Sequence, residues 1–372
     1  MKDLRGRDLL RLRGVATGSP LIGPRSVNIH LTNVCNLACR FCWYHSPLVT
    51  FDEKKKELDI AVFKRVIDDC AAMSVDAVDL EGGEVVCYSQ AEEAFRYVSR
   101  SGVALHAYTN LAYGRKPLAY VALADRLNVN FSAVNRESYR QMHGADHFDQ
   151  VVENIRILTS LHARKKKPRI WLTFIINENN FRDIELFLAL ADSLGVERVF
   201  FRLFEATVEM KSLVFSGASA RILGPLLIRL LGCAYKTPNN LEEISAVVNN
   251  GQFLENIADI PRTTHNNDRF FYYHNLRSPT TRCYTGWFFS LIDEKGRVIA
   301  PCDNIGVCIA GNVYKNSFKD IWFSSEKFRR IRQEALHCID TRKRKWKECR
   351  YCGHAVFNQE MDDFIAQRKV AS

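Results

Sequence analysis

The sequence lacks any apolar run long enough to cross a membrane. A membrane-spanning helix needs roughly 20 consecutive apolar residues, whereas the best candidate, 226–235, is shorter and contains Arg229. Residues 1–13 are rich in Arg and Lys but are followed by no apolar core, so the pattern of a signal peptide is also missing. This N-terminal stretch indicates a soluble, frayed segment. The two absences predict a cytoplasmic protein without a membrane partner.

Cysteine, by contrast, is abundant, with 12 residues in a chain of 372. Without a secretion signal, thiols at this density indicate a reducing compartment, where they serve metal or redox chemistry instead of disulfides. The hydrophobic fraction of 47% and the charged fraction of 25% are those of an ordinary globular protein. The length predicts two domains.

The chain is basic, with a formal net charge of +10 concentrated in the runs 164–169 and 342–345. We interpret these runs chiefly as solvated surface, because the first falls where a helix hands over to a strand. A nucleic-acid-binding patch is a second interpretation, which we do not favour. A third is a docking surface for an acidic electron donor of the flavodoxin or ferredoxin type.

Three cysteines follow the strand-like run 27–31. Cys35, Cys39 and Cys42 form a C-x3-C-x2-C triplet in a short loop, which can bring three thiolates onto one metal centre. A closed zinc site needs a fourth ligand, and His45 could supply it, although structural zinc ligands usually come as two separated pairs. A [4Fe-4S] cluster held by three cysteines would instead leave one iron open to a small molecule.

The triplet, with an aromatic residue before its third cysteine, resembles the signature of the radical S-adenosylmethionine (SAM) superfamily. The resemblance implies a [4Fe-4S] cluster whose open iron is chelated by SAM. One electron then cleaves SAM into methionine and a 5′-deoxyadenosyl radical, which abstracts hydrogen from a substrate.

Strand and helix patterns alternate six times between residues 26 and 204. Apolar runs rich in β-branched and aromatic residues predict strands at 26–32, 77–80, 104–108, 129–134, 170–176 and 198–204. Helical patterns fall between them at 60–73, 91–101, 117–126, 148–164 and 184–194. Such alternation predicts an α/β fold with parallel strands joined by right-handed crossovers. Six units are too few for a closed eight-unit barrel and suit the partial (β/α)6 TIM-type barrel that the resemblance implies.

Parallel α/β folds place ligands at the carboxyl ends of their strands. The cysteine loop follows the first predicted strand, and Glu81, Gly82, Gly83 and Glu84 follow the second. The tetrapeptide alone is as consistent with a plain turn, but at this position it resembles the family's GGE motif, which binds the amino group of SAM. In many relatives a Pro comes next, whereas this chain has Val85.

Asn110 and Ser132, near the ends of later strands, stand where relatives contact the ribose or carboxylate of SAM, and Arg202, inside the sixth predicted strand, could pair with the SAM carboxylate. Turn caps or satisfied sheet-end groups explain the first two equally well. Arg202 could equally pair with a neighbouring Glu. Two further polar residues, Asn177 and Asn180, are predicted to form a loop.

The alternation stops after residue 204. Residues 205–281 combine helical segments with an aromatic passage at 270–274. We predict a bridge, which either packs against the side of the barrel or covers its mouth and excludes water.

A second cysteine set lies near the C-terminus. Cys283 and Cys302 bracket a hairpin pattern, and Cys349 and Cys352 form a C-x2-C pair; zinc and [4Fe-4S] both suit four thiolates. The spacing resembles the Twitch domain, the shortened relative of the SPASM domain, which implies an auxiliary [4Fe-4S] cluster. Two further thiols, Cys308 and Cys338, are interpreted as spare. The predicted domains are 1–25, 26–204, 205–281 and 282–372.

The resemblance predicts a radical SAM enzyme with two [4Fe-4S] clusters that oxidises a small polar metabolite by dehydrogenation, as in aminocyclitol alcohol dehydrogenases. One alternative is a maturase that crosslinks or epimerises a ribosomally made peptide, although only some 25 residues precede the first strand, which leaves no leader-binding domain. Another is a non-enzymatic zinc or iron-sulfur protein that binds nucleic acid. No catalytic base can be named.

Overall fold

The computed structural model describes residues 6–50, 53–204, 208–213, 215–216, 218–219, 222–223, 225–226, 243–244, 282–300, 308–337 and 354–370. Most of the predicted bridge lies outside the described residues. The predicted ligands Cys302, Cys349 and Cys352, and the thiol Cys338, lie outside them as well.

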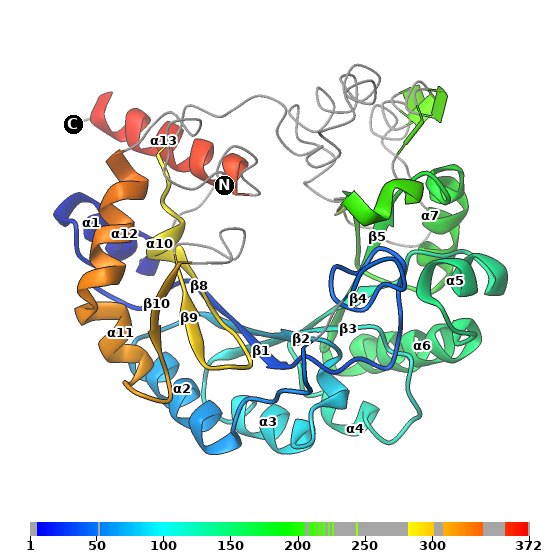
Figure 1. Ribbon diagram of the computed structural model, residues 1–372, viewed down its shortest axis with the longest axis horizontal. Coiled ribbons are helices and arrows are strands. Elements are labelled where there is room, and N and C mark those ends of the chain that lie inside the picture. Colours follow the sequence, from blue (N-terminus) through cyan, green and yellow to red (C-terminus); the bar gives the residue numbers. More distant parts are fainter. Residues whose placement is uncertain are drawn as a thin grey trace.

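The described strands form one 10-stranded sheet in the order β10-β9-β8-β1-β2-β3-β4-β5-β6-β7. Figure 1 shows this sheet curved into an open horseshoe with the helices on its outer side. The strands are β1 (Ser26–Thr32), β2 (Ala77–Gly82), β3 (Ala104–Thr109), β4 (Arg126–Asn130), β5 (Arg169–Ile176), β6 (Arg198–Leu203), β7 (Glu243–Ile244), β8 (Phe289–Ile292), β9 (Arg297–Ile299) and β10 (Ile309–Asn312). The pairs from β1 to β6 are all parallel, which confirms the predicted α/β partial barrel.

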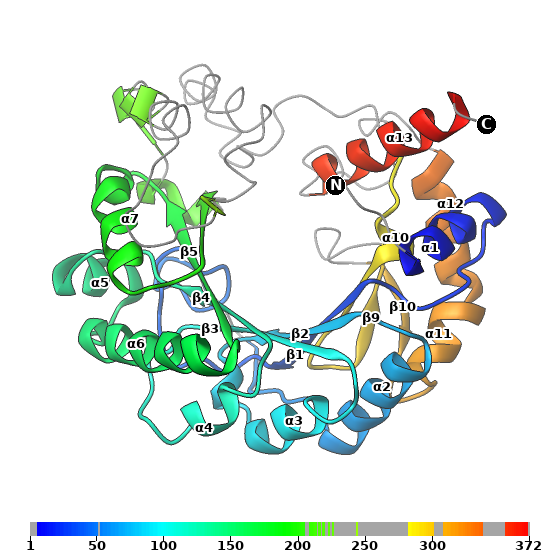
Figure 2. The same ribbon diagram turned by 180° about the vertical axis from the view of Figure 1, so that it is seen from behind.

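The helices of the barrel run along the outer face of the sheet, as the view from behind also shows (Figure 2). They are α2 (Ile60–Ala72), α3 (Ala91–Val98), α4 (Leu118–Val121), α5 (Arg136–His143), α6 (Phe148–Lys165) and α7 (Ile184–Ser193). The remaining helices are α1 (Arg7–Thr17), α10 (Thr285–Phe288), α11 (Phe318–Ser324), α12 (Glu326–His337) and α13 (Ala355–Val370). In the described part of the chain, none of them is long and apolar enough to span a bilayer.

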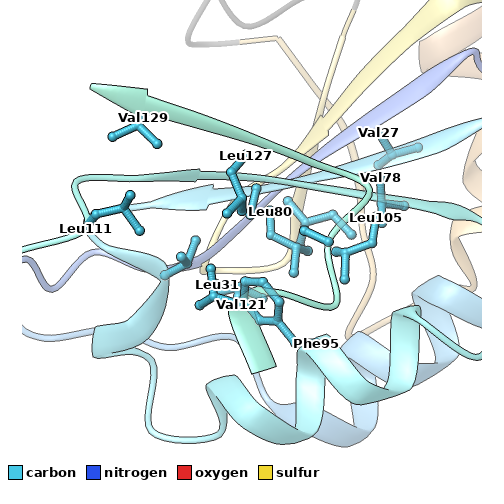
Figure 3. Packing of buried hydrophobic residues seen from close by; sticks show 14 of the residues in the cluster. Val27, Leu31, Val78, Leu80, Phe95, Leu105, Leu111, Val121, Leu127 and Val129 are labelled. Atoms are coloured by element: carbon cyan, nitrogen blue, oxygen red, sulfur yellow. The ribbon is translucent and has the colours of Figure 1, made fainter. Parts of the chain in front are cut away.

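The core lies between the sheet and these outer helices (Figure 3). Leu80 of β2 and Leu105 of β3 point toward Phe95 of α3 and Val121 of α4, and all four side chains are fully buried. Because side chains alternate along a strand, the residues between these apolar ones face the concave side of the sheet. That inner face is mostly polar, and it is the face on which the site is built.

Several predicted boundaries in the barrel are wrong; the helix expected at 91–101, for example, ends at Val98. The fourth strand was expected at 129–134 but pairs at Arg126–Asn130, because beyond it the N–H of Ile175 donates to the Ser132 hydroxyl and not to a backbone carbonyl. The helix expected at 117–126 is only Leu118–Val121. The helix ends early because Asp125 is already bonded to Leu105 of β3. The Asp125 N–H donates to the Leu105 carbonyl, and the Asp125 carboxylate accepts from the Leu105 N–H.

The N-terminal stretch is not frayed from residue 7 onward. Helix α1 begins at Arg7, and Arg11 on it is buried. The Arg11 guanidinium pairs with Asp8 at 2.7 Å and with Asp76 at 2.8 Å and donates to the carbonyls of Gly23 and Pro24. These bonds hold α1 against the barrel, at the amino-terminal edge of its strands.

The predicted C-terminal hairpin is present as β8 and β9. Its first strand also pairs in parallel with β1, with Ser26 opposite Phe289 and Ile29 opposite Ile292. The C-terminal region therefore extends the barrel sheet beyond β1, a contact that the sequence pattern did not indicate.

Candidate metal centre

The cysteine loop is held at the carboxyl end of β1 by backbone hydrogen bonds from two sides. The N–H of Gly83 donates to the Thr32 carbonyl at 2.8 Å, and the N–H of Arg40 donates to the Met142 carbonyl near the end of α5 at 2.9 Å. Cys35, Cys39 and Cys42 are all partly buried free thiols. The fold thus places the triplet where parallel strands end, as predicted.

Every sulfur of the triplet has a nitrogen neighbour. The backbone N of Leu37 lies 3.5 Å from Cys35 Sγ, the backbone N of His45 lies 3.3 Å from Cys42 Sγ, and ring Nδ1 of His143 lies 3.2 Å from Cys39 Sγ. Bonds of this kind suit sulfurs that carry negative charge, since donors to ligating sulfurs stabilise iron-sulfur centres.

The thiols are close enough to affect one another's ionisation. Burial raises the pKa of Cys35 to about 12. Burial, reinforced by the charges of Cys35 and Cys42, raises the pKa of Cys39 well above its ordinary value. Metal binding offsets the cost of ionising these buried thiols, because a coordinating thiol is deprotonated outright.

The donor set fits a cluster better than a single ion. Among the described residues, which include the triplet and His45, no three Cys, His, Asp or Glu side chains converge closely enough to hold one metal ion. A closed zinc site needs four ligands around one ion, so the zinc interpretation with His45 is not supported. In a [4Fe-4S] cluster each cysteine ligates a different iron, and the sulfurs stand further apart.

Gly82 and Gly83 allow the end of β2 to approach the cysteine loop. Gly82 has a φ of 136°, and an added Cβ there would lie 2.3 Å from the Thr32 carbonyl oxygen. At Gly83 an added Cβ would lie 2.1 Å from the Val34 carbonyl oxygen. The absence of side chains at Gly82 and Gly83 therefore lets the backbone of the cysteine loop approach the end of β2 closely.

Glu84 is buried and braces the end of β3. Its carboxylate accepts hydrogen bonds from the Thr109 hydroxyl and from the backbone N–H of Asn110, both at 2.7 Å. Burial raises its pKa to about 7, although the bonds from Asn110 and Thr109 act in the opposite direction. The Glu84 carboxylate is therefore occupied mainly by hydrogen bonds within the protein.

Asn110 connects β3 to the cysteine loop. Its Nδ2 donates to Asn36 Oδ1 at 2.8 Å and lies 3.9 Å from Cys35 Sγ. Asn36 in turn donates to the Ala112 carbonyl at 2.7 Å. The Asn110 side chain therefore borders the first cysteine of the triplet directly.

Ser132 lies just beyond β4 and is fully buried. Its hydroxyl donates to Asn130 Oδ1 at 3.1 Å and accepts from the N–H of Ile175 at 2.9 Å. Its backbone N–H donates to His143 Nε2 at 3.1 Å. These bonds give Ser132 a role in joining β4, β5 and α5. Nearby, Asn177 and Asn180 form the expected loop.

Glu81 faces the inner side of the sheet, unlike Glu84. Asn28 Nδ2 donates to Glu81 Oε1 at 2.8 Å, and His30 Nε2 lies 3.7 Å from Glu81 Oε2. Burial opposes protonation of His30, but the bond to Glu81 and the charges of Glu81, Glu294 and Asp293 leave its pKa raised. Glu81 and His30 thus form an inner-face pair on adjacent strands.

A second polar group lies on the inner face toward the amino ends of the strands. Asp79 accepts from Arg126 at 2.8 Å and contacts His106 Nδ1 at 3.2 Å. The guanidinium of Arg126 also lies 4.4 Å from the ring centroid of Trp171. No motif singles these residues out in the sequence, and the only signal for them is the alternation of polar and apolar residues in β1, β2 and β3.

Arg202 of β6 is exposed and belongs to the same inner face. Burial and the charge of Glu81 raise the pKa of Tyr108, while Arg126 and Arg202 act against this rise. Within the described part of the chain no ion pair of Arg202 is present, but the neighbouring Glu205 lies outside that part, so the alternative pairing with a Glu stays a prediction.

Of the auxiliary cysteines, only Cys283 is described. It is buried just before α10, and its N–H donates to the Ala335 carbonyl of α12. Cys308, interpreted as spare, is partly buried, and its carbonyl accepts from Ala300 N at 2.9 Å. This bond places Cys308 opposite Ala300, which directly follows β9 and is two residues before Cys302 in sequence.

Comparison with known proteins gives two family matches. The model described as the radical SAM superfamily matches residues 29–190, and the SPASM model, described as an iron-sulfur cluster-binding domain, matches residues 283–353.

Curated relatives match the barrel region. A protein of Saccharolobus islandicus named "Probable GTP 3',8-cyclase" is 30% identical over 185 residues, which cover 49% of this chain and 56% of that protein. One of the same name from Metallosphaera sedula is 26% identical over 187 residues, 49% of this chain and 55% of that protein. The chain therefore spans about half the length of the curated relatives it matches.

Solved structures match most of the chain in fold. Streptococcus suis SuiB bound to the precursor peptide SuiA has a TM-score of 0.64 at 13% identity, covering 92% of this chain and 74% of that one. The structure titled native anSMEcpe with bound AdoMet has a TM-score of 0.59 at 14% identity, covering 88% of each chain. At these identities the likeness establishes the fold alone. The two family matches show that this chain combines a radical SAM domain at residues 29–190 with an iron-sulfur cluster-binding SPASM domain at residues 283–353, with SAM and two iron-sulfur clusters as its cofactors.

Proposed function

We propose that this chain cleaves SAM reductively at a cluster held by Cys35, Cys39 and Cys42 and abstracts hydrogen from a substrate carbon. The observation that carries the proposal is the triplet at the carboxyl end of β1, with a nitrogen neighbour at each sulfur. When bound, the cluster and SAM supply a 5′-deoxyadenosyl radical. The protein's own residues hold the cofactors and orient the substrate.

The SAM-binding edge in this proposal runs beside the cysteine loop. The backbone at Gly82 and Gly83 and the side chain of Asn110 border the loop and contact SAM. Glu84 and Ser132, both buried in bonds to neighbouring strands, act by holding this edge in place.

Glu81 and Arg202 lie on the inner face, where their opposite charges suit the ammonium and carboxylate groups of a ligand. Glu81 is anchored by Asn28 at 2.8 Å, which fixes the direction of its carboxylate. Both residues retain in this proposal the SAM-binding role that the family resemblance implies.

For the substrate we propose a small polar metabolite. Its support is the polar inner face, where His30, Glu81, Asp79, His106 and Arg126 are positioned by hydrogen bonds and ion pairs. The reaction would be a net oxidation: beyond the abstracted hydrogen atom, the substrate would give up one proton to a base and one electron, for which the auxiliary cluster would supply the acceptor. Cys283, Cys302, Cys349 and Cys352 are the proposed ligands of that cluster.

A peptide substrate is the second candidate. The solved structures similar to this chain include SuiB with its precursor peptide and anSMEcpe with the peptide named Kp18Cys. The match to this anSMEcpe structure covers 88% of this chain. Proteins that share this fold therefore bind peptides. Incubation with candidate peptides and with polar metabolites, followed by mass spectrometry for loss of two hydrogens or a new crosslink, separates the two substrates.

Electron delivery by a flavodoxin or ferredoxin type protein is also part of the proposal. The described basic run begins with Arg164, Lys165 and Lys166, which are exposed at the end of α6. They lie next to the amino end of β5, whereas the cysteine loop lies at the carboxyl ends of the strands. We therefore do not propose this basic run as the docking site of the electron-donor protein. We interpret it as a solvated helix end, where basic residues complement the helix dipole.

The test of the proposed function is anaerobic. The reconstituted chain, reduced with dithionite in the presence of SAM, is expected to release 5′-deoxyadenosine, and Cys39→Ala is expected to abolish the release. Bound zinc without any 5′-deoxyadenosine would contradict the proposal and favour the non-enzymatic alternative.

A further inference from the structure

His143 occupies a fixed position at the end of α5. It is fully buried, and its ring stacks on Tyr139 with a centroid separation of 4.4 Å and an interplanar angle of 22°. Phe41, in the cysteine loop, meets the same ring edge-on at 5.4 Å. Packing on two sides leaves the imidazole a single orientation, so the partners of its two nitrogens are defined.

The first nitrogen, Nε2, accepts a hydrogen bond. The backbone N–H of Ser132 lies 3.1 Å from it in a buried setting. A backbone amide can only donate, so Nε2 must present its lone pair. This excludes both the imidazolium, in which each nitrogen donates, and the tautomer with hydrogen on Nε2. The ring therefore carries its single N–H on Nδ1.

The second nitrogen, Nδ1, lies 3.2 Å from Cys39 Sγ. Since Nδ1 carries the hydrogen, it is the donor and the sulfur is the acceptor. We propose that His143 is a positioning residue that donates an Nδ1–H···S hydrogen bond to Cys39 when this cysteine ligates the SAM-binding cluster. The inference rests on the proposed function, because it requires the cluster to be bound at the triplet.

This bond has a consequence for electron transfer. A hydrogen bond to a ligating sulfur stabilises the extra negative charge of the reduced cluster and raises its reduction potential. Second-shell donors also fix the direction of the ligand they contact. The residue before His143 supports the same loop, since the Met142 carbonyl accepts from Arg40 N at 2.9 Å. The end of α5 thus sets both the placement and the potential of the centre.

Two substitutions of His143 each remove one of its two hydrogen bonds, either the bond to Cys39 or the bond to Ser132. In His143→Asn the amide nitrogen reaches the position of Nδ1 and keeps the donor to Cys39, but the acceptor for Ser132 is lost. In His143→Gln the amide oxygen reaches the position of Nε2 and keeps that acceptor, but the donor to Cys39 is lost. Both lose the aromatic stack on Tyr139, so they are matched in packing.

The main measurement is a redox titration of the reconstituted full-length protein, followed by electron paramagnetic resonance. The SAM-binding cluster is identified as the one whose signal changes when SAM is added. We expect His143→Gln to lower its midpoint potential and His143→Asn to keep that of the unsubstituted protein. Equal potentials in both variants, or a fall only in His143→Asn, would overturn the proposal.

A second measurement does not depend on cluster loading or on folding of the variants. Nitrogen-15 NMR of the histidines in the unsubstituted, cluster-free protein reports which ring nitrogen is protonated. We expect hydrogen on Nδ1 of His143, and hydrogen on Nε2 would refute the tautomer argument. If iron analysis found no cluster at the triplet, the proposed function would fail while the NMR result still stood.

Discussion

The backbone N–H of Asn110 donates to the carboxylate of Glu84 across 2.7 Å, in the buried interior next to the cysteine loop. The Thr109 hydroxyl donates to the same carboxylate. A single acidic side chain therefore holds the turn after β3 against the end of β2. Its ionisation is coupled to the stability of the whole fold.

The first prediction concerns the pH dependence caused by Glu84. Its pKa in the folded chain is about 7, above the ordinary value of 4.5. Between these values the folded chain holds a proton that the unfolded chain has released, so stability falls as the pH rises through this window. The loss amounts to at most about 3 kcal/mol. Glu84→Gln is expected to remove this slope.

The measurement is urea unfolding of the cluster-free protein at a series of pH values. Glu92→Gln, at an exposed carboxylate on α3, serves as the control and should leave the slope unchanged. A slope that survived in Glu84→Gln would show that another group causes it.

The second prediction concerns the close approach at Gly83. An added Cβ would lie 2.1 Å from the Val34 carbonyl oxygen, so Gly83→Ala must displace the cysteine loop. We expect a destabilisation of about 1–3 kcal/mol together with lower iron content after reconstitution. Gly114→Ala is the matched control, because nothing lies within 4 Å of its added Cβ. Thermal unfolding and iron assays check both variants, and equal behaviour would contradict the geometry.

The third prediction concerns the number of irons bound. Two [4Fe-4S] clusters correspond to about eight irons per chain. Substitution by Ala of any triplet cysteine, or of Cys283, Cys302, Cys349 or Cys352, is expected to remove about half of them. Cys70→Ala, at a buried thiol on α2, should lose none. If Cys349→Ala kept all its iron and Cys308→Ala lost half, the auxiliary ligand set would have to include Cys308.

The fourth prediction concerns helix α1. The Arg11 side chain is fully buried and pairs with Asp8 and Asp76, and breaking a buried pair typically costs about 3–5 kcal/mol. Arg11→Ala is therefore expected to destabilise the chain by roughly 3 kcal/mol. Arg7 contacts the same Asp76 at 2.7 Å but is exposed, so Arg7→Ala should change stability by less than about 1 kcal/mol. Similar values from urea unfolding of the two variants would mean that α1 is not docked through Arg11.

The sequence was informative wherever a local pattern decides the structure. The alternation of apolar runs predicted β1 and α2 almost to the residue, because each buries an apolar face by its own periodicity. The triplet was equally local, since its spacing alone brings the thiols together. Where an apolar run extends past its last pairing partner, as after Asn130, the pattern misplaced the strand end.

Contacts between distant residues were not predictable in this way. Whether Glu81 or Glu84 faces the inner side of the sheet depends on how β1 and β2 are aligned. In that alignment His30 pairs with Glu81, which is 51 residues away in the sequence. The contact of His143 with Cys39 spans 104 residues. Nothing in the sequence around His143 indicates a bond to the metal-binding loop.

The pairing of β8 with β1 bears on how the chain can be divided. The strand that leads into the cysteine triplet has β2 on one side and β8 on the other. Removing residues from 282 onward would turn β1 into an edge strand with a row of unpaired N–H and carbonyl groups, which invites aggregation. The radical SAM and SPASM segments are thus separable in sequence comparison but are joined by a hydrogen-bonded pair of strands, so they should be expressed and folded together.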